Sequence, residues 1–313
     1  MSGFRILITD GLDENGQSIL RAAADVEERT GITPEELLES VMDYAALIVR
    51  GRTRVTRSVI EAGRTLRVIG RAGVGVDNID LEAARQRHIT VVNAPTSTTS
   101  AVAELAFGLL LALAREIPRA DAAMKKGQWL KKELRGVELA GKTLGIIGFG
   151  RIGMELGKRA AAFGMNIVAY DPLIREDAVR AGGAESVSLQ DLYAWSDFIS
   201  LHLPFDVQSR DLIGPLAIAQ MKEGVRLICA ARGGIMDEAA LLSALESGKV
   251  AGAALDVFEA EPPGPTDLVM HPRVIATPHI GAQTAEAQAR AAEDIAREVL
   301  AALENLPLRW KVA

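Results

Sequence analysis

The four histidines of the chain are the side chains best suited to proton transfer near neutral pH. His88 lies in a basic segment and is expected to be exposed, and His271 precedes a proline and is expected in a loop. His202 and His279 each follow a short apolar run that predicts a strand. A glycine soon after His279 leaves room for a ligand, which favours His279, while His202 stays a candidate.

An arginine and a carboxylate follow two further predicted strands. Arg232 comes after the apolar run at residues 225–230, and Glu261 comes after the run at residues 252–257. Because ligands bind beyond the carboxyl ends of strands in an open α/β sheet, we expect these groups to share one edge with the histidine. There an arginine can pair with a substrate carboxylate, a histidine can move a hydroxyl proton, and a carboxylate can fix the histidine tautomer. This set predicts hydride transfer at a carbonyl without a metal; a structural salt bridge for Arg232 and a solvated loop acid for Glu261 are the alternatives.

A glycine-rich motif, Gly148-Phe149-Gly150-Arg151-Ile152-Gly153, links a predicted strand to a predicted helix. Its glycines allow a tight turn, a close backbone approach to a pyrophosphate and helix–strand packing. The pyrophosphate is then expected at the helix N-terminus. Asp171 ends the next strand, where its carboxylate is expected to accept hydrogen bonds from the adenosine ribose and to repel a 2′-phosphate. The predicted cofactor is therefore NAD, a preference that the nearby Arg175 weakens slightly; a glycine turn without a ligand is the alternative.

Alternating apolar runs and helical patterns predict parallel sheets built from βα units, and the length of 313 residues favours two domains. The first half offers four strands, and the second half offers six, as in a dinucleotide-binding domain. The predicted strands are Arg5–Thr9, Ala46–Arg50, Arg67–Gly70, Thr90–Asn93, Thr143–Gly148, Asn166–Tyr170, Phe198–His202, Val225–Ala230, Gly252–Val257 and Val274–Thr277. The predicted domains are residues 1–97 with 284–313, and residues 98–283.

Composition narrows the range of partners and compartments. A net charge of -6 argues against a general nucleic-acid binder, and a single cysteine, Cys229, excludes an intrachain disulfide framework and favours a reducing compartment. The first ten residues predict a strand and not a signal peptide, and the apolar run at residues 101–114 is too short to span a bilayer. We expect a cytoplasmic protein with no bound metal, membrane or nucleic acid.

Four segments resemble, in order, motifs of the D-isomer-specific 2-hydroxyacid dehydrogenases; they are residues 144–153, 230–238, 254–263 and 277–282. The resemblance implies two doubly wound α/β domains, with a Rossmann NAD-binding domain inserted in a discontinuous flavodoxin-like substrate domain. It also implies a cleft between the domains and a homodimer formed largely through the NAD-binding domains. By resemblance, Arg232, Glu261 and His279 are catalytic, which selects His279 over His202.

Within the family, residues 47–50, 71–78 and 124–129 are most similar to members that oxidise 3-phospho-D-glycerate to 3-phosphooxypyruvate in serine biosynthesis. This implies that Arg50 and Arg71 hold the phosphate or carboxylate of a small anionic substrate, with Val74 and Gly75 contributing backbone N–H groups; surface arginines are the alternative. The cofactor contacts implied by the resemblance are Val74, Arg151, Ile152, Asp171, Leu203, Ala230, Asp256, His279 and Gly281.

Two departures and two rival functions accompany the resemblance. Cys229 stands three residues before Arg232, where relatives often carry asparagine. A cysteine lacks the hydrogen bonds of that amide, so the sequence does not say what holds the arginine in place. The chain ends soon after the last predicted helix, so feedback by serine through a C-terminal regulatory domain is not expected. The rivals are a D-2-hydroxyacid dehydrogenase or glyoxylate/hydroxypyruvate reductase of other substrate preference, and an NAD(H)-sensing corepressor, because one fold serves several functions.

Overall fold

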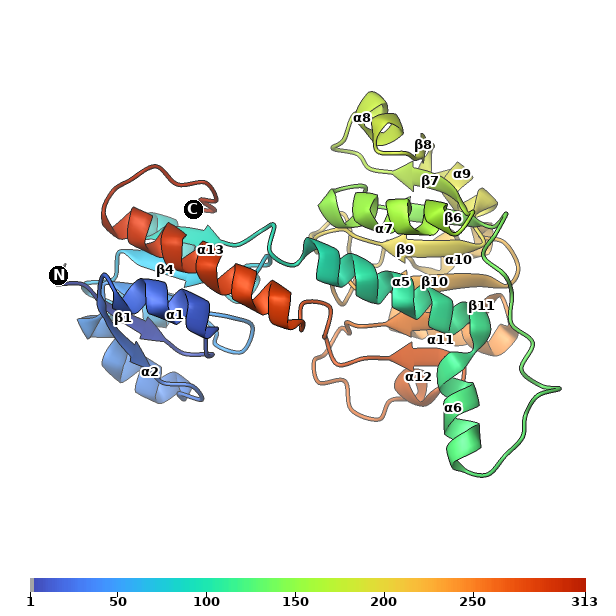
Figure 1. Ribbon diagram of the computed structural model, residues 1–313, viewed down its shortest axis with the longest axis horizontal. Coiled ribbons are helices and arrows are strands. Elements are labelled where there is room, and N and C mark those ends of the chain that lie inside the picture. Colours follow the sequence, from blue (N-terminus) through green and yellow to red (C-terminus); the bar gives the residue numbers. More distant parts are fainter. Residues whose placement is uncertain (1–2) are drawn as a thin grey trace. The chain divides into compact units, whose positions relative to one another are not determined.

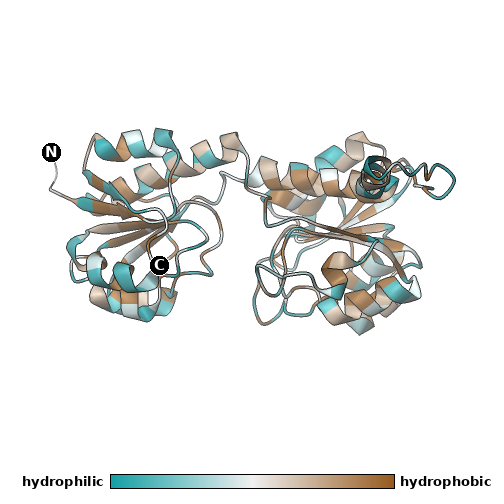
Figure 2. Ribbon diagram, turned by 90° about the horizontal axis from the view of Figure 1, so that it is seen from below, coloured by the Kyte–Doolittle hydropathy of each residue, from teal (hydrophilic) through white to brown (hydrophobic). Residues whose placement is uncertain are grey.

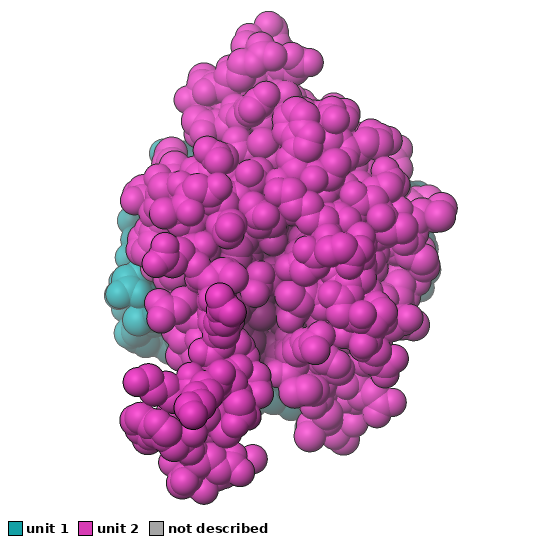
Figure 3. Space-filling model, turned by 90° about the vertical axis from the view of Figure 1, so that its right-hand side faces the viewer, with its two compact units in different colours: residues 1–98, 282–313 teal, residues 99–281 magenta. Residues whose placement is uncertain are grey.

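The computed structural model describes residues 3–313 and divides into two compact units (Figures 1 and 3). Unit 1 consists of residues 1–98 and 282–313, and unit 2 of residues 99–281. The last helix of the chain thus belongs to the unit that the first 98 residues form.

Unit 1 contains one five-stranded parallel sheet in the order β2-β1-β3-β4-β5. Its strands are β1 (Arg5–Ile8), β2 (Asp25–Glu28), β3 (Ala46–Val49), β4 (Val68–Arg71) and β5 (Thr90–Asn93). Its helices are α1 (Glu14–Arg21), α2 (Pro34–Ser40), α3 (Arg57–Ala62), α4 (Leu81–Gln86) and α13 (Ala285–Leu303), with a short 3-10 helix at Val41–Asp43. This strand order is the flavodoxin-like one, which confirms the predicted fold of this unit.

Unit 2 contains a seven-stranded parallel sheet in the order β12-β11-β10-β9-β6-β7-β8. Its strands are β6 (Thr143–Ile147), β7 (Asn166–Tyr170), β8 (Glu185–Ser186), β9 (Phe198–Leu201), β10 (Val225–Cys229), β11 (Val250–Leu255) and β12 (Val274–Ala276). Its helices are α5 (Thr99–Arg115), α6 (Ile117–Lys125), α7 (Arg151–Ala162), α8 (Glu176–Ala181), α9 (Leu189–Trp195), α10 (Pro215–Gln220), α11 (Glu238–Ser247) and α12 (Asp267–Met270). The first six strands follow the Rossmann order, and β12 extends the sheet beyond them.

The sequence prediction missed one strand in each sheet. β2 has the sequence DVEE and lies at the edge of its sheet, so it carries no apolar run. β8 is two residues long, also at an edge, and too short to produce an alternating pattern. The count of six strands for the second sheet was therefore wrong by one, and His202 follows its fourth strand in chain order.

The buried apolar residues of each unit form clusters along its sheet. Figure 2 shows the hydrophobic strands of each sheet between two layers of helices. On unit 2 the buried face of α5, which includes Ala103 and Leu110, packs beside α7. On unit 1, α13 packs against α1, where Gly16 approaches the Ala292 carbonyl so closely that a Cβ would lie 2.5 Å away. None of the helices among residues 3–313 is long and apolar enough to cross a bilayer.

Candidate active site

Glu261 and His279 form a hydrogen-bonded pair beyond the carboxyl ends of β11 and β12. The Glu261 Oε2 atom lies 2.8 Å from His279 Nδ1. The other oxygen of Glu261 accepts a hydrogen bond of 3.2 Å from the Phe258 N–H. With the carboxylate at Nδ1, the proton of a neutral imidazole belongs on Nδ1, which leaves Nε2 to exchange a proton with a ligand. The His279 side chain is 48% exposed and the Glu261 side chain 39% exposed, so a small molecule can reach this pair.

A buried carboxylate holds the backbone around His279. His279 has a left-handed φ of 52°, a conformation that costs energy for a residue with a Cβ. Asp256, which is 1% exposed, accepts hydrogen bonds of 2.8 Å from both the Ile280 and Gly281 N–H groups and one of 2.6 Å from the Thr277 hydroxyl. Both oxygens of Asp256 therefore fix the turn that presents His279. A direct contact of Asp256 or Gly281 with a cofactor stays a prediction.

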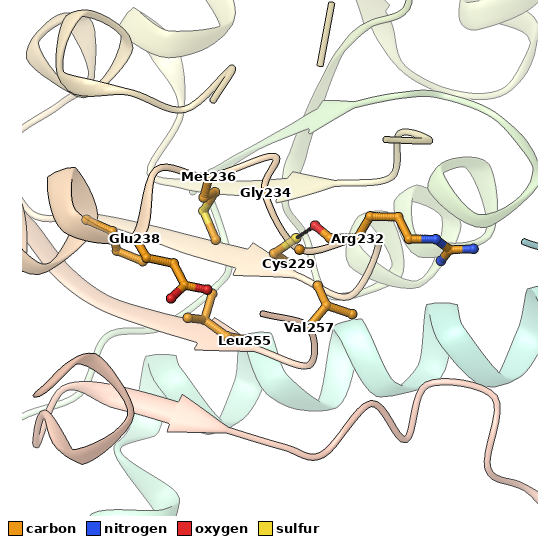
Figure 4. Close-up of a pocket in the computed structure, with 9 residues that line it drawn as sticks. Cys229, Arg232, Gly234, Met236, Glu238, Leu255 and Val257 are labelled. Atoms are coloured by element: carbon orange, nitrogen blue, oxygen red, sulfur yellow. Dashed lines mark hydrogen bonds between the residues drawn. The ribbon is translucent and has the colours of Figure 1, made fainter. Parts of the chain in front are cut away.

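Arg232 lies in the tight turn that leaves β10, and its side chain extends away from a small cavity lined by Cys229 and Glu238 (Figure 4). The Cys229 thiol donates a long hydrogen bond of 3.6 Å to the Arg232 carbonyl. Burial raises the pKa of Cys229 to about 11, so the group is a thiol at neutral pH. Cysteine at this position therefore still supports the arginine turn, through a weak donor instead of an amide.

His202 has a different environment from His279. Its Nε2 atom lies 2.8 Å from the hydroxyl of the buried Ser200. Burial lowers the pKa of His202 to about 4, so its imidazole is neutral near pH 7. An imidazole with so low a pKa holds a proton weakly and so neither accepts nor donates one readily at that pH, which favours His279 as the proton-transfer group.

The glycine motif forms the expected turn between β6 and α7. Gly148 has φ +90°, and a Cβ there would lie 2.5 Å from the His202 carbonyl oxygen; a Cβ at Gly153 would lie 2.3 Å from the Gly148 carbonyl oxygen. In contrast, a Cβ added to Gly150 would meet no atom within 4 Å, and Gly150 supplies no side chain to cap α7. The first-turn N–H groups of α7, including those of Arg151 and Ile152, are thus approachable by an anion.

Asp171 follows β7 and supports the same turn. Its carboxylate accepts hydrogen bonds from the N–H groups of Phe149 (2.8 Å), Leu173 (2.9 Å) and Ile174 (3.2 Å). A carboxylate has about four acceptor positions, so one is left for a ribose hydroxyl. Leu203 packs on Gly148, and Ala230 is buried at the end of β10. The residues present therefore fit a dinucleotide.

In unit 1, Arg50 and Arg71 lie at the carboxyl ends of adjacent strands, β3 and β4. The Val74 carbonyl accepts a hydrogen bond of 2.7 Å from the Asn93 side chain, which fixes the loop that contains Gly75. Burial lowers the pKa of Arg50, although the charge of Asp10 opposes this effect. These positions are compatible with anion binding at this edge of the sheet.

Sequence reasoning missed the residues that hold Arg50. The Asp10 carboxylate, 4% exposed, accepts hydrogen bonds from the N–H groups of Arg50 (2.8 Å) and Thr53 (3.0 Å). The Asn78 amide donates to the Arg50 carbonyl at 3.0 Å and to the Thr53 carbonyl at 2.7 Å. The only available signal was a carboxylate directly after the first predicted strand.

Comparison with known proteins decides the family. Residues 107–281 match the family model described as "D-isomer specific 2-hydroxyacid dehydrogenase, NAD binding domain". A glyoxylate reductase structure from Paecilomyes thermophila superposes with a TM-score of 0.91 at 33% identity, over 100% of this chain and 99% of that chain. The chain belongs to the D-isomer-specific 2-hydroxyacid dehydrogenase family.

Two other members of the family that resemble this chain have a cofactor or a substrate in their descriptions. A D-lactate dehydrogenase structure from Aquifex aeolicus, complexed with NAD and lactic acid, has a TM-score of 0.84 and 30% identity over 96% of each chain. The D-3-phosphoglycerate dehydrogenase of Methanocaldococcus jannaschii is 51% identical over 94% of this chain. The chain spans 56% of the length of that relative. Unit 2 thus contains the family's NAD-binding domain.

Proposed function

We propose that this protein oxidises 3-phospho-D-glycerate to 3-phosphooxypyruvate with NAD, as the first oxidative step toward serine. The observation that carries the proposal is the 2.8 Å contact of Glu261 with His279 at the edge of the sheet that binds the dinucleotide. The 51% identity to a D-3-phosphoglycerate dehydrogenase supports this substrate over other 2-hydroxy acids.

In this proposal the C2 hydroxyl oxygen loses a proton, and C2 of the same substrate loses a hydride. His279 Nε2 takes the proton of the C2 hydroxyl, and Glu261 stabilises the imidazolium through Nδ1. Arg232 pairs with the substrate carboxylate and with the oxygen that becomes the carbonyl. NAD supplies the hydride acceptor when it is bound. Arg50, Arg71 and the backbone of Val74 and Gly75 are assigned to the substrate's phosphate and carboxylate.

The cofactor is assigned to residues of unit 2, with Val74 of unit 1 as one further proposed contact. The N–H groups of Arg151 and Ile152, beside Gly150, receive the pyrophosphate, and Asp171 accepts from the adenosine ribose. Gly148 keeps the turn tight enough for this approach. Leu203, Ala230, Asp256 and Gly281 complete the proposed cofactor contacts around them.

The test is turnover of the purified chain with NAD and 3-phospho-D-glycerate, followed as NADH, with a parallel panel of 2-keto acids and NADH. We expect turnover of 3-phospho-D-glycerate and a loss of kcat by about 10²–10⁴-fold in His279→Ala. His88→Ala serves as the matched histidine control. Preference for glyoxylate, hydroxypyruvate or another 2-keto acid would contradict the assigned substrate and identify a reductase of that acid. Binding of NAD(H) without any turnover would favour a sensor.

We also propose a cytoplasmic homodimer, without a membrane or nucleic-acid partner, assembled through unit 2. Helix α6 projects from the body of that unit (Figure 1), and Ile117, Met124 and Trp129 are 52%, 56% and 75% exposed on it and the segment after it. Exposed apolar side chains of this size are typical of protein interfaces. Sedimentation of wild type and Trp129→Glu tests the assembly.

A further inference from the structure

We propose that Glu238, the first residue of α11, is a positioning residue that sets the geometry of the Glu261–His279 pair. Its Oε1 atom accepts a hydrogen bond of 2.8 Å from the N–H of Glu259. Glu259 lies two residues before Glu261 in the loop that leaves β11. The inference rests on the proposed function for its catalytic consequence, but its structural content concerns this chain alone.

Two loops meet at the peptide that Glu238 holds. A Cβ added to Gly233 would lie 1.8 Å from the Phe258 carbonyl oxygen and 2.8 Å from the Glu259 nitrogen. The turn that contains Arg232 therefore packs directly on the Phe258–Glu259 peptide. Because Glu238 begins the helix that follows this turn, its carboxylate joins the segment of Arg232 to the loop of Glu261.

The same peptide leads to the histidine through two further hydrogen bonds. The Phe258 N–H donates to Glu261 Oε1 at 3.2 Å, and Glu261 Oε2 contacts His279 at 2.8 Å. A shift of residues 258–259 would thus change the contacts of both oxygens of the Glu261 carboxylate. A carboxylate that is itself held by a hydrogen bond fixes the orientation of the imidazole that it contacts.

The surroundings of Glu238 are unusual for a carboxylate at the start of a helix. It lines a cavity of about 10 Å³ together with Cys229, Arg232 and Val257 (Figure 4), close to the smallest space that holds one water molecule. Burial raises the pKa of Glu238, against the hydrogen bond from the Glu259 N–H, which lowers it. A carboxyl group held in this place, against the cost of its partial burial, is consistent with a role beyond helix stability.

The first test needs no substrate and uses hydrogen–deuterium exchange of the full chain. In Glu238→Ala we expect the amide of Glu259 to exchange about tenfold faster, because its hydrogen bond to Glu238 is lost, and the amide of Phe258 to exchange faster because the peptide that joins the two residues is released. Glu238→Gln keeps an acceptor and should exchange like wild type. Glu246→Ala makes the same charge change at an exposed position of α11 and is the control. Unchanged exchange in Glu238→Ala would overturn the inference.

The second test is a double-mutant cycle on turnover. Glu238→Ala should lower kcat about tenfold with an unchanged KM for NAD, and Glu238→Gln should recover most of it. In a Glu261→Gln background, Glu238→Ala should have no further effect, because its action passes through Glu261. Effects that multiply would overturn the positioning role. If wild type shows no turnover, the proposed function fails, and the exchange experiment alone decides the role of Glu238.

Discussion

Asp10 and Arg50 are joined by a hydrogen bond of 2.8 Å from the Arg50 N–H to the Asp10 carboxylate, although 40 residues separate them in the sequence. The same carboxylate also binds the Thr53 N–H and hydroxyl and the Arg52 side chain. One buried group thus organises the loop that presents the proposed anion-binding arginine.

Replacement of Asp10 should therefore affect stability and substrate binding together. We expect Asp10→Ala to lower the free energy of unfolding by about 1–3 kcal/mol, since buried backbone donors lose their acceptor. KM for 3-phospho-D-glycerate should rise more than KM for NAD. Denaturant unfolding and steady-state kinetics measure the two effects, with the exposed Glu39→Ala as control. An equal rise in both KM values would contradict the link to Arg50.

The stability contribution of Asp10 should depend on pH. Burial would raise its pKa, but the hydrogen bonds from Thr53 and Arg50 and the charge of Arg52 lower it overall. A carboxyl group with a lowered folded-state pKa stabilises the protein above its unfolded-state value and loses that contribution as pH falls through the folded value. The difference between wild type and Asp10→Ala should hence shrink below about pH 4. A difference that does not change with pH would show that the charge plays no part.

The glycines of the turn before α7 should respond differently to alanine. Gly150 faces open space, so Gly150→Ala should fold normally and weaken NAD binding, because the new methyl group occupies the approach of the pyrophosphate. At Gly153 a Cβ meets the Gly148 carbonyl at 2.3 Å, so Gly153→Ala should lower the melting temperature as well. Thermal unfolding and NAD titration separate the two effects. Equal losses of stability would refute the distinction.

Cys229 should be unreactive in the folded protein. It is 2% exposed, and burial raises its pKa to about 11, so little thiolate exists at neutral pH. A thiol reagent at pH 7.5 should label the protein only after unfolding, at a rate that follows the denaturant concentration. Rapid labelling under native conditions would mean that the turn around Arg232 opens readily.

Local patterns predicted the parts of the site that depend on short segments. The turn of the glycine motif and the position of Asp171 after β7 could be predicted because turn, helix start and strand end follow each other within one βα unit. The meeting of Glu261 and His279 followed from the rule that carboxyl ends of parallel strands share an edge. Glu238 was not found, because its hydrogen bond to Glu259 spans 21 residues and depends on how α11 packs. The edge strands β2 and β8 were missed because their sequences, DVEE and ES, have no apolar pattern.

The interrupted course of unit 1 has a consequence for biosynthesis. Helix α13 packs on α1 and β4, and residues 310–313 pair with β5, so the chain's last 32 residues complete a unit begun at its start. Unit 2 is continuous in sequence and has all of its segments available earlier during translation. Because domains fold as units while the chain emerges, we expect unit 2 to mature first on the ribosome. Until α13 has been synthesised and packs on unit 1, the apolar face that it covers would be exposed to chaperones and proteases.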